Sequence, residues 1–347
     1  MKSVEVKGKT YEIDKNGFLD LGLLEITDMN DIKGLNKLKK LKHLELSSNE
    51  IEEISNLDDL KGLKFLNLGS NNIKEIKGLD NLKNLEVLHL ISNDITEIKG
   101  LENLKKLKEL YLRGNQITEI KGLENLSKLE KLDLSWNLIE KIEGLDKLKN
   151  LQVLWVAGNQ IKEIEGLDEL SNLKILNLAG NRIERIKNLD NLTNLQELYL
   201  NNNEITEITG LDNLKNLESL WLNSNEIEVM KGFDNLINLK ILNLKDNKIR
   251  TIGGLYHLIK LEKLFLSENE IFEISGLETL QNLETLDLCG NKIQFIRGLE
   301  ALMNLKDLWI ANNPIPKQIL DELGGLDPSG CANLPMKFVE YSLIKMS

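Results

Sequence analysis

The hydrophobic residues of this chain recur with a period of 22 residues. If Leu41 is taken as position 1 of a repeat, leucine returns at position 1 in twelve further repeats and ends at Leu305. Positions 1, 4, 6, 11, 14, 17 and 20 are apolar from repeat to repeat, and position 16 is mostly glycine. The interval from Asn49 to Asn313 is 264 residues, or twelve periods, so no insertion interrupts the repeats.

A fixed period of this length is typical of a solenoid, because a single coil cannot bury its own leucines and stacked coils can. Positions 3–8 alternate and predict a short strand with the leucines of positions 4 and 6 inward. The glycine of position 16 then opens a short helical or 3-10 turn on the outer face, with an acidic residue near its start. We expect these strands to form a parallel sheet along one side.

Position 9 is asparagine in every copy. A buried amide must be hydrogen-bonded, so we assign these side chains a structural role in a ladder along the solenoid. The ladder comprises Asn49, Asn71, Asn93, Asn115, Asn137, Asn159, Asn181, Asn203, Asn225, Asn247, Asn269, Asn291 and Asn313.

The pattern L-x-x-L-x-L-x-x-N-x-I-x-x-I-x-G-L-x-x-L-x-x resembles the leucine-rich repeat, specifically its short 22-residue type, over residues 19–316. The regulatory subunit of type-1 serine/threonine phosphatase and the internalins share this type. The resemblance implies an α/β solenoid: a curved horseshoe with a parallel concave sheet, short helical or 3-10 convex segments, and a cap at each end. It also implies a binding scaffold, since the phosphatase regulator holds its catalytic subunit on the concave face.

The two ends depart from the repeat, as the ends of a solenoid must. Residues 4–13 predict a hairpin, and residues 19–40 match the repeat loosely, with Met29 and Ile32 at positions 11 and 14 and Thr27 in place of the asparagine. Residues 317–323 and 336–345 predict two helices, the second covering the last coil with Phe338, Val339 and Leu343. We therefore expect an N-terminal cap over residues 1–40, a repeat array over 41–316 and a C-terminal helical cap over 317–347.

The composition of the chain disfavours several classes of function and partner. The chain has 44 basic and 55 acidic residues, a net charge of −11, which disfavours nucleic acid and anionic membranes as partners. It shows no signal peptide and no run of about 18 apolar residues, so we expect a cytoplasmic protein. Cys289 and Cys331 are expected to be free thiols. The scattered histidines and the missing metal motifs predict no cofactor, no metal site and no enzymatic activity.

Large side chains gather at the positions that the repeat leaves free. Positions 3, 5, 7 and 8 line the concave sheet, and all four tryptophans fall there. This face carries eight acidic and four basic residues, so it suits a protein partner with a basic, partly apolar surface, either a folded domain or a long extended segment. The candidate partner-binding residues are Phe65, His89, Tyr111, Asp133, Trp136, Trp155, Glu197, Tyr199, Trp221, Phe265, Asp287, Asp307 and Trp309.

The outer surface turns apolar in the C-terminal third. Ile237, Tyr256, Ile259, Phe272, Phe295 and Met303 stand there, whereas earlier repeats carry lysine at position 21. Two interpretations stay open: a second interface, and packing beneath the C-terminal cap. The glutamates of position 13 and the lysines of position 15 are interpreted as a solubilising surface.

The sequence thus predicts a non-catalytic scaffold or regulator that holds a protein partner on an acidic, aromatic concave face. A phosphatase regulator and a small-GTPase or cytoskeletal regulator are the specific possibilities. The alternatives are a secreted or surface adhesin of the internalin type, and a structural module with no ligand of its own.

Overall fold

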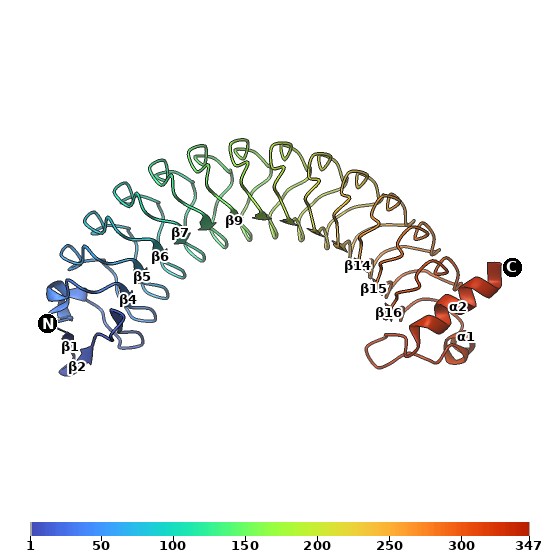
Figure 1. Cartoon of the computed structure of the whole chain (residues 1–347), viewed down its shortest axis with the longest axis horizontal. Helices are drawn as coiled ribbons and strands as arrows, with labels where there is room; N and C mark the ends of the chain where they lie inside the picture. The colour runs from blue at the N-terminus through green and yellow to red at the C-terminus, as the bar shows by residue number, and fades with distance from the viewer. Residues whose placement is uncertain (1, 347) are drawn as a thin grey trace. The chain divides into compact units, whose positions relative to one another are not determined.

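One short strand per coil is the repeating element of the structure. The computed structural model describes residues 2–346 and divides into two compact units. The first unit runs to Ile161 and includes Glu165–Leu173, and the second holds Lys162–Ile164 and the chain from Lys174 onward. Figure 1 shows the strands of successive coils side by side within each unit.

The strands are parallel within each unit and lie one coil apart. In the first unit they are β3 (Phe18–Asp20), β4 (His43–Glu45), β5 (Phe65–Asn67), β6 (Val87–His89), β7 (Glu109–Tyr111), β8 (Lys131–Asp133) and β9 (Val153–Trp155). In the second they are β10 (Ile175–Asn177), β11 (Glu197–Tyr199), β12 (Ser219–Trp221), β13 (Ile241–Asn243), β14 (Lys263–Phe265), β15 (Thr285–Asp287) and β16 (Asp307–Trp309). The parallel solenoid expected from the 22-residue period is confirmed.

Each strand is shorter than expected and covers positions 3–5 only. Parallel hydrogen bonds continue beyond it, for instance from Leu46 N to Asn67 O (2.8 Å) and from Ser48 N to Gly69 O (2.9 Å). The residue at position 8 has a positive φ, as at Ser48 (φ 54), and this left-handed residue turns the chain away from the sheet. The strand therefore ends because the bend to position 9 begins within the stretch predicted as strand.

The asparagine of position 9 fixes that bend. The Asn137 side-chain amide donates to the carbonyls of Leu112 (3.0 Å) and Leu134 (3.0 Å), and its oxygen accepts from Ile117 N (3.0 Å). Two of these partners belong to the preceding coil, so each asparagine joins two coils. The same pattern repeats along the array, and the leucines and isoleucines around it are buried.

The segment behind the core turns without forming the helices that we expected. Leu60 N donates to Leu57 O and Leu63 N donates to Leu60 O (both 2.9 Å), and this spacing of three recurs in later coils. A 3-10 helix needs such bonds from consecutive residues, whereas here each leucine closes a separate turn. The residues that the structure describes include two 3-10 helices, η1 (Met29–Asp31) and η2 (Leu35–Lys37), both in the first coil.

Position 16 requires a left-handed backbone. Gly100 has φ 73, and a Cβ there would collide with the carbonyl of Ile76 in the coil before. Asn56 (φ 59) and Asn188 (φ 58) adopt the same conformation, as expected for the residue type that best tolerates it after glycine.

The register predicted for the first coil is wrong by three residues. Leu19 pairs with Leu44 rather than with Leu41. Ile26 N donates to Asn49 Oδ1 (3.0 Å) as Ile51 N does to Asn71, so Ile26 holds position 11. It follows that Met29 holds position 14, and that Leu24 instead of Thr27 stands where the asparagine would be.

The hydrophobic pattern could not reveal this shift. Apolar residues recur every third residue in this stretch, at Ile26, Met29, Ile32, Leu35, Leu38 and Leu41, so a displacement of three preserves the pattern. Gly34 (φ 88) already holds position 16 in the regular spacing. The first coil therefore contains three extra residues, and they are accommodated around η1.

The expected N-terminal hairpin is present. Strands β1 (Ser3–Val6) and β2 (Lys9–Glu12) pair antiparallel, and Val4 and Val6 are buried. Glu5 and Lys33 exchange backbone hydrogen bonds of 3.1 and 2.9 Å. The hairpin thus packs on the first coil and shields its leucines from water.

The C-terminal segment closes the last coil with both helices and an added edge. Helix α1 (Lys317–Glu322) is followed by Gly324 and Gly325, both with positive φ. The chain then runs antiparallel beside β16, with Ala332 N donating to Leu308 O (2.7 Å) and Ile310 N to Gly330 O (3.2 Å). This occupies the sheet edge that β16 would otherwise expose.

Helix α2 (Pro335–Met346) buries Phe338 and Val339 as predicted, but Leu343 is 46% exposed. Ser342 is fully buried in place of Leu343. Its hydroxyl accepts from Leu299 N (3.1 Å) and donates to Glu300 (2.9 Å). Ser342 lies four residues after Phe338 and three after Val339, so it shares their helix face, whereas Leu343 lies at the margin.

Candidate functional site

A chain of aromatic rings runs along the sheet face of the first unit, where sheet face means the side chains at positions 3, 5, 7 and 8. The ring centroids are 5.6 Å apart for His43 and Phe65, 5.2 Å for Phe65 and His89, 4.3 Å for His89 and Tyr111, and 6.4 Å for Tyr111 and Trp155. Three of these separations fall in the range of favourable ring pairs, about 4.5–7 Å, and the stacked His89–Tyr111 pair is slightly closer. We call these five residues the ring chain.

The ring chain is present because strand residues two apart point to the same side of the sheet. His43 and Phe65 occupy position 3, and the other three rings occupy position 5 of their strands. His43 is exposed and the other four rings are half-buried, so one face of each remains open to solvent. Sequence reasoning identified four of the five, but treated His43 as an isolated histidine.

The remaining residues of position 5 mostly accept hydrogen bonds from the backbone. Asp133 accepts from Ser135 N (2.9 Å), and Asp287 accepts from Cys289 N (3.1 Å). Asp20, Glu45, Asn67, Asn177 and Asn243 make the same bond to position 7. Both candidate aspartates therefore have a structural partner at the end of their strand.

The sequence Glu-Leu-Tyr occurs on β7 and again on β11 and has the same geometry in both. The Tyr111 hydroxyl donates to Glu109 (2.7 Å), and the Tyr199 hydroxyl donates to Glu197 (2.6 Å). Burial and the neighbouring carboxylate raise the pKa of Tyr199 to about 12 and that of Tyr111 further. Both tyrosines stay neutral at physiological pH, and each hydroxyl is tied to the carboxylate two residues before it.

Glu109, Lys131 and His89 set the charge around the centre of the ring chain. Burial opposes ionisation of Glu109, but hydrogen bonds from Tyr111 and Lys131 outweigh it and lower the Glu109 pKa. Lys131 lies 3.0 Å from this carboxylate. Burial lowers the pKa of His89, against the opposing pull of Glu109 and Glu45. The ring chain is therefore uncharged at its centre and acidic at its margin.

In the second unit the rings of position 5 are more separated. Tyr199 and Trp221 stack at 6.0 Å, and the Trp221 indole donates to Ser219 Oγ (2.8 Å). In the strand register Asn243 lies between Trp221 and Phe265. Asp287 lies between Phe265 and Trp309, and Asp307 accepts a bond from Thr285 (3.2 Å). The second unit thus presents one ring pair followed by alternating polar and aromatic residues.

Trp136 differs from the other tryptophans because it occupies position 8. It has φ 57, an unfavourable backbone region for a large residue, and its side chain is 61% exposed. Its indole lies over Gly158 in the next coil, where a Cβ would come within 2.8 Å of the ring. The glycine makes room for a large ring at the border of the ring chain.

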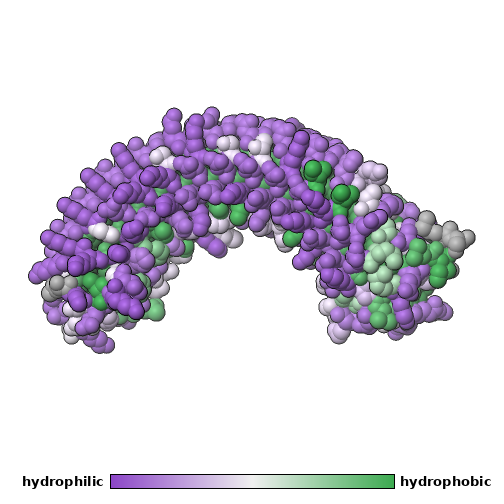
Figure 2. Space-filling view, in the orientation of Figure 1, coloured by the Kyte–Doolittle hydropathy of each residue, from purple (hydrophilic) through white to green (hydrophobic). Residues whose placement is uncertain are grey.

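The candidate second-interface residues are all exposed. Their exposed fractions run from 49% for Ile237 to 71% for Tyr256, so none is packed beneath the C-terminal cap. Figure 2 shows hydrophobic side chains exposed on the C-terminal half. They are spread over positions 12, 13, 18 and 21, before and after the turn of position 16.

Both cysteines are free, as expected. Burial and the Asp287 carboxylate raise the pKa of Cys289 to about 11. Burial likewise raises the pKa of Cys331, which lies beside Trp309 in the added edge. Both are therefore protonated at neutral pH, which disfavours nucleophilic chemistry.

A second asparagine ladder at position 22 escaped sequence analysis. Asn84 donates to the carbonyl of Lys61 in the preceding coil (2.8 Å), and Asn150 donates likewise to Ser127 (2.8 Å). Asn172, Asn216, Asn238, Asn282 and Asn304 repeat the bond. The signal was a column of asparagines 22 residues apart, interrupted by lysines.

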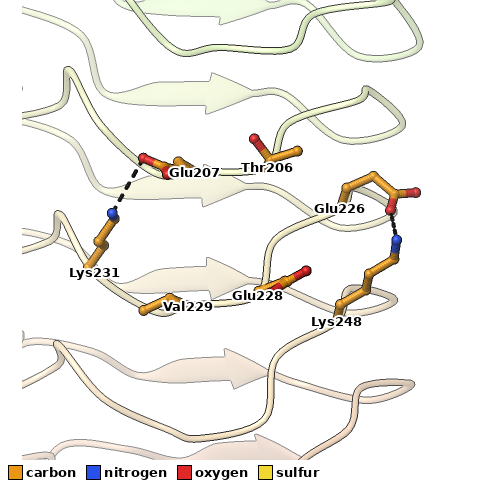
Figure 3. Close-up of a pocket in the computed structure, with 7 residues that line it drawn as sticks. All are labelled: Thr206, Glu207, Glu226, Glu228, Val229, Lys231 and Lys248. Atoms are coloured by element: carbon orange, nitrogen blue, oxygen red, sulfur yellow. Dashed lines mark hydrogen bonds and ion pairs between the residues drawn. The ribbon is translucent and has the colours of Figure 1, made fainter.

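A hollow of about 260 Å³ lies on the flank of the second unit, between the segments that follow β11 and β12. Figure 3 shows Glu207 facing Lys231 and Glu226 facing Lys248 across the hollow, with Val229 between Glu228 and Lys231 on one side of it. It is a gap between paired surface side chains. Within the part of the chain that the structure describes, no cluster of histidine, cysteine and acidic side chains could hold a metal ion, and no helix is long and apolar enough to cross a membrane.

The family models identify the repeat. The model described as leucine-rich repeats in two copies matches residues 61–103, 105–147, 149–191, 193–235 and 281–325, and further leucine-rich-repeat models match residues 215–271 and 37–52. These matches cover more than half of the chain, which therefore belongs to the leucine-rich-repeat family. The repeat is of the short type. No curated protein matches the chain.

Solved structures share the fold. An internalin of Listeria monocytogenes is 30% identical, with a TM-score of 0.78 over 88% of this chain and 90% of its own. A leucine-rich-repeat protein of Leptospira interrogans is 27% identical, with a TM-score of 0.75 over 88% and 94%. A chain of the octameric complex of latrophilin 3, Unc5D and the leucine-rich repeats of FLRT2 is 25% identical, with a TM-score of 0.67 over 80% and 92%. Such folds commonly bind other proteins and are typically non-catalytic.

Proposed function

We propose that this protein is a non-catalytic scaffold whose sheet face holds a protein partner. The observation that carries the proposal is the ring chain, whose four half-buried rings and exposed His43 extend over strands β4 to β9. Rigid aromatic side chains that keep one face in solvent supply contact area at low entropic cost and are enriched where proteins bind.

The acidic residues around the rings define the chemistry of the partner. Glu45, Glu109 and Asp133 border the ring chain, and Lys131 neutralises Glu109 in part. A partner surface with apolar groups flanked by lysine or arginine matches this arrangement. A role as regulator of a phosphatase or GTPase in the cytoplasm remains a prediction within this proposal.

The test compares two triple variants that each remove three aromatic side chains. The first is Phe65→Ala with Trp136→Ala and Trp155→Ala on the sheet face of the first unit. The second is Tyr256→Ala with Phe272→Ala and Phe295→Ala on the outer surface. Proteins captured by the wild type from lysate of the source cells are identified by mass spectrometry, and the affinity of the captured partner is measured for each variant.

We expect the sheet-face variant to lose the partner and the outer variant to keep it. Equal binding by both variants would contradict the sheet-face assignment, and loss in the outer variant alone would assign binding to the outer apolar residues. Thermal unfolding of both variants shows whether either loss comes from unfolding.

A surface adhesin is the second candidate, favoured by the 30% identity to an internalin over 88% of this chain. Localisation separates the two candidates: an antibody that labels unpermeabilised cells supports the adhesin, and labelling only after permeabilisation supports the intracellular scaffold.

A further inference from the structure

One edge of the first unit is strongly basic although the chain as a whole is acidic. Positions 21, 22 and 2 surround the point where each coil enters its strand. Over residues 39–152 these positions contain eleven lysines and two glutamates, Glu86 and Glu130. The lysines, which we call the lysine edge, are exposed: Lys39, Lys40, Lys42, Lys61, Lys64, Lys83, Lys105, Lys106, Lys108, Lys128 and Lys149.

Most lysines of the lysine edge form no ion pair. Lys64 and Lys108 share Glu86 (2.8 and 3.2 Å), and Lys149 pairs with Glu169 (3.1 Å). The other eight lysines form no ion pair with any side chain that the structure describes, and one of them, Lys106, donates to the Asn84 side-chain oxygen (2.7 Å). By contrast, the lysines of position 15 are paired: Lys77 with Glu53 (3.1 Å), Lys99 with Glu75 (3.6 Å) and Lys121 with Glu119 (2.9 Å).

Acidic side chains of position 18 bond to other partners and form no ion pair with the lysine edge. Glu102 and Glu124 at position 18 accept hydrogen bonds from the backbone of Gly100 and Gly122 (both 3.1 Å). Asp58 and Asp80 accept from asparagines of the next coil. A row of like charges that the protein leaves unpaired costs folding free energy, so its position along one edge points to an external anion.

The edge widens into a hollow at its N-terminal end. This hollow of about 630 Å³ lies where the hairpin meets the first coil, and Lys2, Lys15, Lys39, Lys40 and Lys42 line it together with Glu12 and Asp14. The Asp14 carboxylate accepts hydrogen bonds from the backbone N–H groups of Asn16 (2.7 Å) and Phe18 (2.9 Å). Three of the five lysines around this hollow, Lys39, Lys40 and Lys42, belong to the lysine edge, and five lysines against two acidic residues leave its lining net positive.

The side chains around these lysines favour carboxylates over nucleic acids and membranes. Positions 21, 22 and 2 contain no arginine and no aromatic residue over this range. Bases of single-stranded nucleic acid are held by stacking on rings, and phosphate recognition favours the arginine fork. Stable membrane anchoring adds apolar insertion to basic charge, and these positions have no apolar residue. Carboxylates need only well-spaced ammonium groups.

We propose that the lysine edge binds an extended acidic segment of a protein, on a surface separate from the sheet face. Five coil steps separate Lys39 from Lys149, which at about 4.8 Å per step span about 24 Å. About seven extended residues cover that length. Repeated glutamate or aspartate in such a segment brings a carboxylate within reach of the long lysine side chains at each coil.

The probe is an octaglutamate peptide, and its binding is measured by fluorescence anisotropy at low and physiological salt. The test variant is Lys61→Gln with Lys83→Gln and Lys105→Gln, and the control is Lys77→Gln with Lys99→Gln and Lys121→Gln. Both remove three charges from the same region and give the same net charge. The carbonyl that Asn84 bonds on Lys61 is unaffected, because it belongs to the backbone.

We expect the test variant to bind the peptide about tenfold more weakly and the control less than about twofold, since exposed charge pairs each contribute little. Equal weakening in both would show that only net charge matters and would overturn the proposal, as would an absence of wild-type binding. A single-stranded oligonucleotide and phosphatidylserine vesicles are measured in parallel. Tighter lysine-edge-dependent binding of either would overturn the assignment to an acidic protein.

Discussion

The two units are built on the same core and carry different surfaces. Asn137 in the first and Asn225 in the second make the same three bonds to backbone groups, at 3.0 Å each. Position 21, in contrast, is lysine at Lys61 and Lys83 and isoleucine at Ile237 and Ile259. The rings of positions 3 and 5 contact one another from His43 to Trp155 in one unit, whereas Asn243 and Asp287 separate the rings of the other after the Tyr199–Trp221 pair. The repeat therefore dictates the core, and the positions that it leaves free can differ in function.

The sharpest test of a shared core is to remove one ladder asparagine from each unit. Asn137→Ala and Asn225→Ala should each destabilise the protein by about 3 kcal/mol, because an isoleucine N–H and two leucine carbonyls lose their partner. Urea unfolding measures the loss. The matched changes at the exposed position-22 ladder, Asn150→Ala and Asn216→Ala, should cost less than about 1 kcal/mol. Unequal losses for the two core asparagines would mean that the units differ inside as well as outside.

Substitution of the left-handed glycine at position 16 tests whether the two units share the same backbone geometry. Gly100→Ala and Gly298→Ala place a Cβ against the carbonyls of Ile76 and Ile274. Each should cost about 2 kcal/mol in a urea titration. Gly253→Ala is the control, because Gly253 has no neighbour within 4 Å of an added Cβ. Its stability should stay level or rise by up to about 1 kcal/mol. Tolerance of Gly100→Ala would refute the steric argument.

The sequence predicted the regular part of the fold because every repeat has the same residue types at the same core positions. The coil, the buried leucines and the left-handed Asn56 and Asn188 all follow from residue type and period. The strand length could not be predicted, because position 8 takes a positive φ with residues as different as Ser48, Trp136 and Glu268. Only the geometry of the bend imposes that conformation.

The candidate site was predicted only in part, because the period fixes which face a residue lies on but not its side-chain conformation. Two-residue alternation places Phe65, His89, Tyr111 and Trp155 on one face, but their stacking depends on side-chain rotamers. His43 was missed because position 5 was given more weight than position 3. The lysine edge was missed because a net charge of −11 conceals local segregation, and which lysines are paired is visible only in three dimensions.

The ring chain predicts a difference between two tyrosines that are otherwise matched. Tyr111 and Tyr199 lie in the same Glu-Leu-Tyr sequence and donate to the same kind of carboxylate. Tyr111 contacts the rings of His89 and Trp155, whereas Tyr199 contacts Trp221. Tyr111→Ala should therefore cost about 1 kcal/mol more than Tyr199→Ala in urea unfolding. Equal costs would show that the rings lie side by side without stabilising one another.

The smallest effect is a pH dependence confined to the first unit. Burial lowers the pKa of His89 below its ordinary value of 6.5. The unfolded chain therefore takes up a proton before the folded one as the pH falls through 6.5, and stability should decrease from there down to the folded pKa. Phe265, at the same repeat position in the second unit, cannot titrate.

His89→Phe keeps a ring between Phe65 and Tyr111 and removes the titration. Thermal unfolding between about pH 7.5 and 5.5 should then show a smaller decrease in Tm for the variant than for the wild type. Carboxylates with lowered pKa, such as Glu109, stay ionised over this range, so they do not mask the effect. An equal decrease in both proteins would show that His89 is solvated in the folded state, and the ring chain would then be more open to water than its packing indicates.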